Sequence, residues 1–432
     1  LGGGDALPLR ARGLIADAAT AALVAADGTI DWWCPRRFDA PAALFRLLDA
    51  TGGAVRVAPE GPVGAGEQSY TEGTNVLRTV LPAGEAAIEV VDLLPWAHQR
   101  PGRRIVRLVT ALRGPVEVRV DVQPGAAFGP AREVSTWSGG IAFDGIAVHA
   151  GAAVEGRTAR FVLDAGERRV VTIDPVDRRP DPLSVEGALD LVERTEVAWR
   201  SHLAPLVYDG PYGEAVARSL LVLRALTTSY GTVVAAPTTS LPTRVGGERN
   251  WDLRYAWVRD TALAVDTAYD MGLSEDAERY VGRLAEICRE EEQLPLRSAS
   301  RLDGSPLDDE EEELPLAGWR HSQPVRVGHR GAGDLQLDFY ADVVSALHSE
   351  QVLAARSRVP AVWSTVADMT DWLSEAWTKP DRGVWELRGA PRHLVSSKLA
   401  AWYALDRTSR LATARNPLDL AAPLWRAAAR GV

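Results

Sequence analysis

The hydrophobic pattern of this chain changes its period near residue 185, and this change limits the fold more than any single motif. Before it, residues 116–122 alternate strictly and place four valines on one face of a half-buried antiparallel strand. Two short apolar runs also flank the Asp27-Gly28 turn, which is a strong β-hairpin signal. Short strands at turn-rich spacing predict an antiparallel β-sandwich over residues 13–185.

After residue 185, apolar residues recur at helical spacing, as Val216, Leu220 and Leu223 do. A linking helix that contains Trp199 is expected over residues 191–206. Further helices are predicted over 214–230, 258–272, 274–290, 333–349, 361–377, 394–411 and 417–430. The long connection 291–332 is a candidate for function, because long loops in compact domains are usually functional. The chain is therefore predicted to be multidomain, with a β-sandwich at 1–185, a linker helix at 186–210 and a helical domain at 211–432.

Composition excludes several classes of function. The 432 residues suffice for two domains, and a net charge of −10 suits neither nucleic acid nor anionic membranes. Two cysteines, Cys34 and Cys288, provide no disulfide scaffold and no metal cluster, and they suit a reducing compartment. No apolar run reaches the roughly 20 residues that span a bilayer, and residues 1–4 do not resemble a secretion signal. We expect a cytoplasmic protein that acts on a small molecule or oligosaccharide without a cofactor or metal.

Residues 249–260 combine three arginines, two aspartates, two tryptophans and a tyrosine. A sugar site needs such groups, because pyranose faces stack on aromatic rings and hydroxyls take paired hydrogen bonds from charged side chains. The alternative is a buried network of ion pairs that fixes the start of a helix. Composition alone leaves both interpretations open.

The same stretch resembles the signature of glycoside hydrolase family fifteen, which contains glucoamylases, glucodextranases and bacterial trehalase-like enzymes. Three further motifs match that family in the same order: Ala235-Ala236-Pro237-Thr238-Thr239-Ser240-Leu241-Pro242, Pro324-Val325-Arg326-Val327-Gly328, and Gly383-Val384-Trp385-Glu386 followed by Arg388-Gly389. The opening from Leu14 to Pro41 is similar to the trehalase-like N-terminal domain of bacterial members. The resemblance implies an (α/α) toroid and an exo-acting, inverting hydrolase of α-glucosides, of the glucoamylase or trehalase type.

The resemblance assigns the general acid to Glu386. Trp385 beside it is expected to form an apolar wall that raises the pKa of the carboxyl group. Inverting enzymes also place a second carboxylate about 6.5–9.5 Å from the acid, with a water between them. We therefore predict that Glu386 lies in a concave site with Trp385 and Trp257 near it.

The resemblance also assigns substrate contacts. Arg259 and Asp260 correspond to residues that grip the nonreducing-end sugar, with Trp257 as an aromatic wall, and the two charged side chains are expected to point different ways. Trp319 and Arg320 match an aromatic-arginine loop over the substrate, although an ordinary surface aromatic would have the same sequence.

Several positions depart from the family pattern. Leu253 stands where a tyrosine is usual, and His329 stands where an asparagine is usual. Asp334 replaces a glutamine, and Ser396 replaces a histidine. Each change removes or alters a polar group in or near the expected pocket, so we include Leu253 and His329 in the predicted substrate site.

The end of the sequence is the larger departure. It stops at Val432, before the family's six helix pairs are complete and before the late loop that carries the family's general base. We expect an incomplete toroid, either because further helices lie outside this sequence or because the domain closes by homo-oligomerisation or rearrangement.

The acidic run 308–313 is predicted to be a solvated loop and not a calcium or catalytic site, because six consecutive carboxylates repel one another. Three functions stay open at this point. The first is an α-glucosidase with Glu386 as its acid. The second is a repurposed fold that uses Glu386 for dehydration or cyclisation of a non-sugar substrate. The third is a non-catalytic carbohydrate-binding protein.

Overall fold

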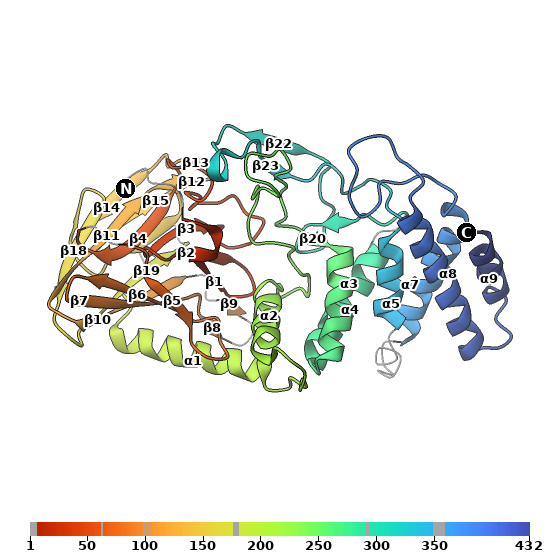
Figure 1. Ribbon diagram of the computed structural model, residues 1–432, viewed down its shortest axis with the longest axis horizontal. Coiled ribbons are helices and arrows are strands. Elements are labelled where there is room, and N and C mark those ends of the chain that lie inside the picture. The colour runs from red at the N-terminus through yellow and green to blue at the C-terminus, as the bar shows by residue number, and fades with distance from the viewer. Residues whose placement is uncertain are drawn as a thin grey trace.

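Two antiparallel sheets face each other across a shared apolar core in the N-terminal region (Figure 1). The computed structural model describes residues 7–61, 64–97, 100–101, 104–175, 181–290, 294–348 and 359–432. The first sheet contains, in spatial order, β1 (Arg12–Ala16), β2 (Ala21–Ala25), β3 (Thr29–Trp33), β4 (Ala54–Pro59), β11 (Val116–Gln123), β18 (Thr158–Leu163) and β17 (Val154–Glu155). The second contains β14 (Val134–Trp137), β15 (Gly140–Phe143), β16 (Ile146–His149), β19 (Arg168–Asp174), β10 (Ile105–Arg113), β7 (Ala86–Leu93), β6 (Leu77–Ala83) and β5 (Glu67–Tyr70).

The sequence patterns that predicted a β-sandwich are confirmed. β2 pairs with β3 across the Asp27-Gly28 turn. In β11 the four alternating valines are buried, and they contribute to the core that both sheets share. Two short pairs lie beside the sheets: β8 (Trp96–Ala97) with β9 (Arg100–Pro101), and β12 (Gly125–Ala126) with β13 (Gly129–Pro130).

Helix α1 (Val185–Leu203) follows the sandwich and begins earlier than predicted. The reason is an N-cap: the hydroxyl oxygen of Ser184 accepts a hydrogen bond from the amide of Gly187 at 3.1 Å. Ala188 and Val192 then pack on the second sheet, along which the helix lies (Figure 1). The predicted Trp199 is buried and meets the ring of Trp96 edge-on.

The remaining helices form two layers. Contacts link α3 (Val258–Asp270), α5 (Phe339–His348) and α8 (Val395–Arg415) in one layer, and α4 (Ser274–Glu290), α7 (Val359–Ala376) and α9 (Ala422–Gly431) in the other. Each helix of the first layer also packs on a helix of the second, around one common core. This is the pairing expected of a toroid-type helical domain. Helix α2 (Gly213–Ala225) lies between these layers and the sandwich (Figure 1).

The segment 291–332 and the stretch before α3 carry short strands. β20 (Ala256–Trp257) pairs with β21 (Ala299–Ser300), and β22 (Glu311–Leu314) pairs with β23 (Val325–Gly328). The β22–β23 hairpin lies above the junction of the two regions in Figure 1. Apolar residues of the sandwich and of this hairpin segment share one cluster, so the junction is packed.

No helix in the part of the chain that the structure describes is both long enough and apolar enough to cross a membrane.

Candidate active site

Glu386 lies in a turn whose backbone is fixed by a buried carboxylate. Asp381 is fully buried and accepts hydrogen bonds from the amides of Leu337 (3.0 Å) and Gly383 (3.2 Å) and from the hydroxyl of Ser397 (2.8 Å). Gly383 has φ of +62°, and a Cβ there would come within 2.4 Å of the Leu394 side chain, so the turn requires glycine. Glu386 itself has φ of +48°, a left-handed conformation that is uncommon for a residue other than glycine.

Three side chains from different segments hold the Glu386 carboxylate. The indole Nε1 of Trp257 and the amide Nε2 of Gln336 donate to its Oε1 atom at 3.0 Å and 3.3 Å. The Nε2 atom of His329 lies 3.2 Å from its Oε2 atom. Trp257 precedes α3, His329 follows β23 and Gln336 precedes α5. The Glu386 side chain retains 23% exposure.

The pKa of Glu386 is lowered from its ordinary value of 4.5, contrary to the sequence prediction. Burial raises this pKa, but the hydrogen bond and charge of His329, together with the hydrogen bonds from Trp257 and Gln336, outweigh burial. The prediction was wrong because it considered only an apolar wall. Trp385 is not that wall, since it is 81% exposed. The aromatic neighbour of Glu386 is Trp257, which contributes a hydrogen-bond donor.

Arg259 and Asp260 occupy the first turn of α3 and form an ion pair at 3.3 Å. The prediction that they point different ways was therefore wrong. Burial raises the pKa of Asp260, and the charge of Glu386 raises it further against the opposing effect of Arg259. The two carboxylates therefore lie close enough to interact.

The charge of Arg259 also acts on two more carboxylates. Burial raises the pKa of Asp338, and burial together with the charge of Asp338 raises that of Asp342 to about 6. Arg259 lowers both values. The charge of one guanidinium thus acts on three carboxylates, and a group of opposite charges of this kind suits a ligand with many hydroxyl groups. Asp338 and Asp342 were not among the predicted site residues, although Asp338 lies in a stretch that keeps the family pattern.

Another part of the 249–260 stretch is structural. Asp252 and Arg254 form a fully buried ion pair at 2.7 Å. Arg254 also donates to the carbonyl of Ala40 in the sandwich region at 2.7 Å, while Asp252 accepts from the amide of Gly328 at 3.1 Å. The interpretation as a buried ion-pair network therefore holds for Asp252 and Arg254, and the sugar-site interpretation of the other residues stays a prediction.

The other predicted substrate contacts are placed as follows. Trp319 is buried in the junction cluster with Trp32 and Phe45, so the alternative of an ordinary surface aromatic was wrong, and its contact with the substrate stays a prediction. The guanidinium of Arg320 lies over the Trp319 ring at 4.7 Å. Leu253 lies between the buried Asp252 and Arg254 in the sequence and is itself 40% exposed. Its carbonyl accepts a hydrogen bond from the amide of Ala236.

The predicted solvated loop at 308–313 is also only partly correct. Glu311, at the start of β22, has a side chain that is only 13% exposed and is paired with two arginines. Within the described ranges, no group of three or more histidine, cysteine, aspartate or glutamate residues could hold a metal ion.

Comparison with known proteins agrees with this geometry. The family model described as glycosyl hydrolases family 15 matches residues 210–430, and the model described as trehalase-like, N-terminal matches residues 1–153. A trehalase of Mycolicibacterium smegmatis is 31% identical over an alignment 468 positions long, which covers 98% of this chain and 69% of that protein. A trehalase of Thermoplasma acidophilum is 30% identical over 420 residues, which cover 93% of this chain and 71% of that protein. A trehalase of Mycobacterium tuberculosis is 29% identical, with 98% and 67% covered. The chain therefore belongs to glycosyl hydrolase family 15 and has a trehalase-like N-terminal region, as its motifs indicated.

Proposed function

We propose that this chain is a trehalase-type glycoside hydrolase that cleaves an α-glucosidic bond with Glu386 as the general acid. The observation that carries the proposal is the Glu386 carboxylate, held by Trp257, Gln336 and His329 beside the Arg259–Asp260 pair. The similarity to three trehalases supports trehalose as the substrate.

In this proposal the protonated Glu386 gives its proton to the glycosidic oxygen while the bond from C1 to that oxygen breaks. Water attacks C1 from the opposite face and passes its proton to a second carboxylate, so that one trehalose and one water give two glucose molecules. We assign Arg259 and Asp260 to hydroxyl groups of the bound glucose, because an aspartate paired with arginine is held for hydrogen bonding. His329 is assigned to the same pocket through its contact with Glu386.

A second candidate is binding of a sugar without turnover. The lowered pKa of Glu386 favours it, because an ionised carboxylate has no proton to donate. If the chain is a hydrolase, Glu386 must therefore gain a proton on substrate binding near neutral pH. At acid pH the carboxyl group of Glu386 is already protonated in the free protein.

The test measures glucose release from trehalose, maltose and isomaltose at several acid pH values. We expect trehalose to be the preferred substrate and Glu386→Gln to lose at least about 10²-fold in kcat. Glu375→Gln, an exposed glutamate on α7, is the matched control and should retain full activity. Tight trehalose binding with no release at any pH would instead establish the binding function.

A further inference from the structure

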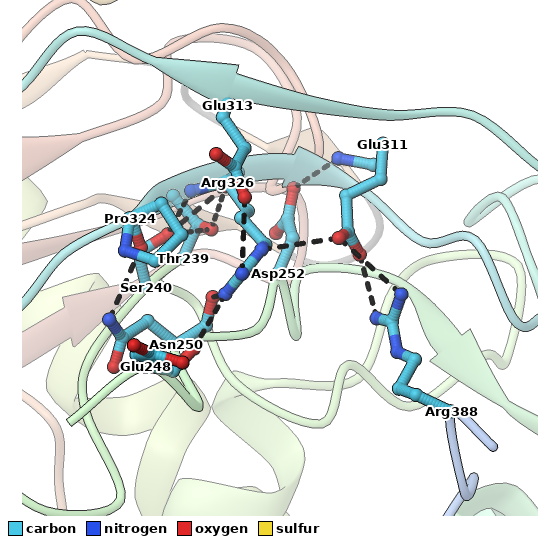
Figure 2. Close-up of polar contacts among 11 residues, drawn as sticks. Thr239, Ser240, Glu248, Asn250, Asp252, Glu311, Glu313, Pro324, Arg326 and Arg388 are labelled. Carbon is cyan, nitrogen blue, oxygen red and sulfur yellow. Dashed lines mark hydrogen bonds and ion pairs between the residues drawn. The ribbon is translucent and has the colours of Figure 1, made fainter.

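Glu311 connects two segments that meet at Glu386. Its carboxylate accepts from the guanidinium of Arg388 at 2.8 Å and 3.4 Å, and it lies 3.2 Å from the Nε atom of Arg326 (Figure 2). Arg388 lies two residues after Glu386, and Arg326 lies three residues before His329. One carboxylate thus joins the segment that carries Glu386 to the hairpin that carries His329.

Trp251 lies under both arginines. The guanidinium carbons of Arg388 and Arg326 lie 4.3 Å and 4.8 Å from the centre of its ring. Two cations this close to one ring repel each other, and an anion between them offsets this repulsion. Glu311 is that anion, and its low exposure strengthens the attraction relative to a surface pair.

The two arginines are held unequally. Arg326 also pairs with Glu313 at 3.2 Å and donates to the carbonyl of Glu248 at 2.7 Å, while its own amide donates to the hydroxyl of Ser240 (Figure 2). Within the described part of the chain, the hydrogen bonds of the Arg388 side chain both go to Glu311, and this side chain is 38% exposed. Loss of the Glu311 charge would therefore leave Arg388 with its contact to the Trp251 ring and without its ion pair. Arg326, in contrast, would keep Glu313 and the Glu248 carbonyl.

Release of Arg388 would free one side of the Glu386 turn. Asp381 anchors the start of that turn through three buried hydrogen bonds. On the other side of Glu386, Arg382 donates to the carbonyl of Leu387 at 2.8 Å, and Arg388 is the side-chain anchor that reaches the β22–β23 hairpin. The hairpin end is held by other contacts, because β22 pairs with β23 and the amide of Gly328 donates to the buried Asp252 carboxylate at 3.1 Å. His329 would keep its position while Glu386 moved away from it.

We propose that Glu311 is a positioning residue that holds the Glu386 turn against His329 through Arg388. Its effect on catalysis rests on the proposed function, whereas its effect on the turn does not. Glu312 provides a matched control, because it is the neighbouring glutamate of the same strand and is exposed.

The first measurement is amide hydrogen exchange of the full chain, which needs no activity. We expect Glu311→Gln to speed exchange in peptides covering residues 384–392 by about 10-fold or more, because the turn opens locally. Exchange in the sandwich strands and the thermal midpoint should stay unchanged, and Glu312→Gln should match the wild type. Unchanged exchange at 384–392 in Glu311→Gln would overturn the proposal, whether or not the protein hydrolyses trehalose.

The second measurement is the kinetics of trehalose hydrolysis. We expect Glu311→Gln to lower kcat by about 10–100-fold and to change KM little, since a displaced acid costs rate more than binding. Arg388→Gln should have the same effect, and the double variant should be no worse than either single one. Arg388→Gln also serves as the test variant if Glu311→Gln fails to fold. In a Glu386→Gln background, Glu311→Gln should cause no further loss. Faster exchange with an unchanged kcat would overturn the positioning role, whereas an inactive wild type would overturn the proposed function alone.

Discussion

The Nε2 atom of His329 lies 3.2 Å from the Oε2 atom of Glu386. The imidazole is 3% exposed and meets the ring of Trp257 edge-on, with centroids 5.3 Å apart. A buried imidazole therefore faces the proposed acid. This pair should set the pH dependence of the reaction.

His329→Asn should move the activity of the enzyme toward higher pH. A general acid works in its protonated form, so kcat/KM falls as pH rises through the pKa of Glu386 in the free enzyme. That pKa is lowered, and His329 supplies the two leading contributions that lower it, while burial raises it. Without His329, burial acts with less opposition and the pKa of Glu386 rises.

We expect the descending limb of kcat/KM to shift upward by about one pH unit in this variant. The measurement is a pH–rate profile on trehalose, with His321→Asn as a control on an exposed histidine. A limb that stays in place, or that moves to lower pH, would contradict the assigned role of His329.

Arg254→Met should destabilise the fold by about 3–5 kcal/mol, because it leaves the Asp252 carboxylate buried without its partner. Urea unfolding measures the loss. Arg194→Met, which breaks an exposed pair with Asp190 on α1, should cost less than about 1 kcal/mol. An equal loss of unfolding free energy in the two variants would show that the buried pair stabilises the fold no more than the exposed pair does.

Leu253→Tyr should raise kcat/KM on trehalose, since it supplies the tyrosine hydroxyl that the resemblance to the family leads us to expect at this position. A pocket that gains a hydrogen bond to a substrate hydroxyl gains roughly 1 kcal/mol or more, about 5–10-fold in kcat/KM. Leu253→Phe has a similar ring without the hydroxyl and should give no gain. An equal effect of both substitutions would assign the change to ring size and not to hydrogen bonding.

The fold could be predicted from local patterns to a large extent. The Asp27-Gly28 hairpin and the alternating valines of β11 act through turn chemistry and side-chain alternation, which are short-range properties. The predicted helix at 258–272 matches α3 closely. The predicted helix at 333–349 begins only at Phe339, because the Leu337 amide is bound by Asp381 from a distant segment.

The site could be predicted only in part, because its contacts are long-range. Motifs identified Glu386, Trp257, Arg259 and His329, but not which way each side chain points. Trp385 and Glu386 are adjacent in sequence, yet one is exposed and the other is held inward, because the turn has a left-handed backbone at Glu386. Glu311 looked like one of six solvated acids, and only its two distant arginines distinguish it.

The most direct test of the central claim follows trehalose cleavage by proton NMR in the wild type and in Glu386→Gln. Sodium azide is added in a parallel sample, because an anion can attack C1 without a base. We predict that cleavage depends on Glu386 and proceeds with inversion. In water the products are one β-glucose and one α-glucose, and with azide β-glucosyl azide also forms. Two α-glucose molecules, equal rates in the two proteins, or no cleavage with or without azide would contradict this prediction.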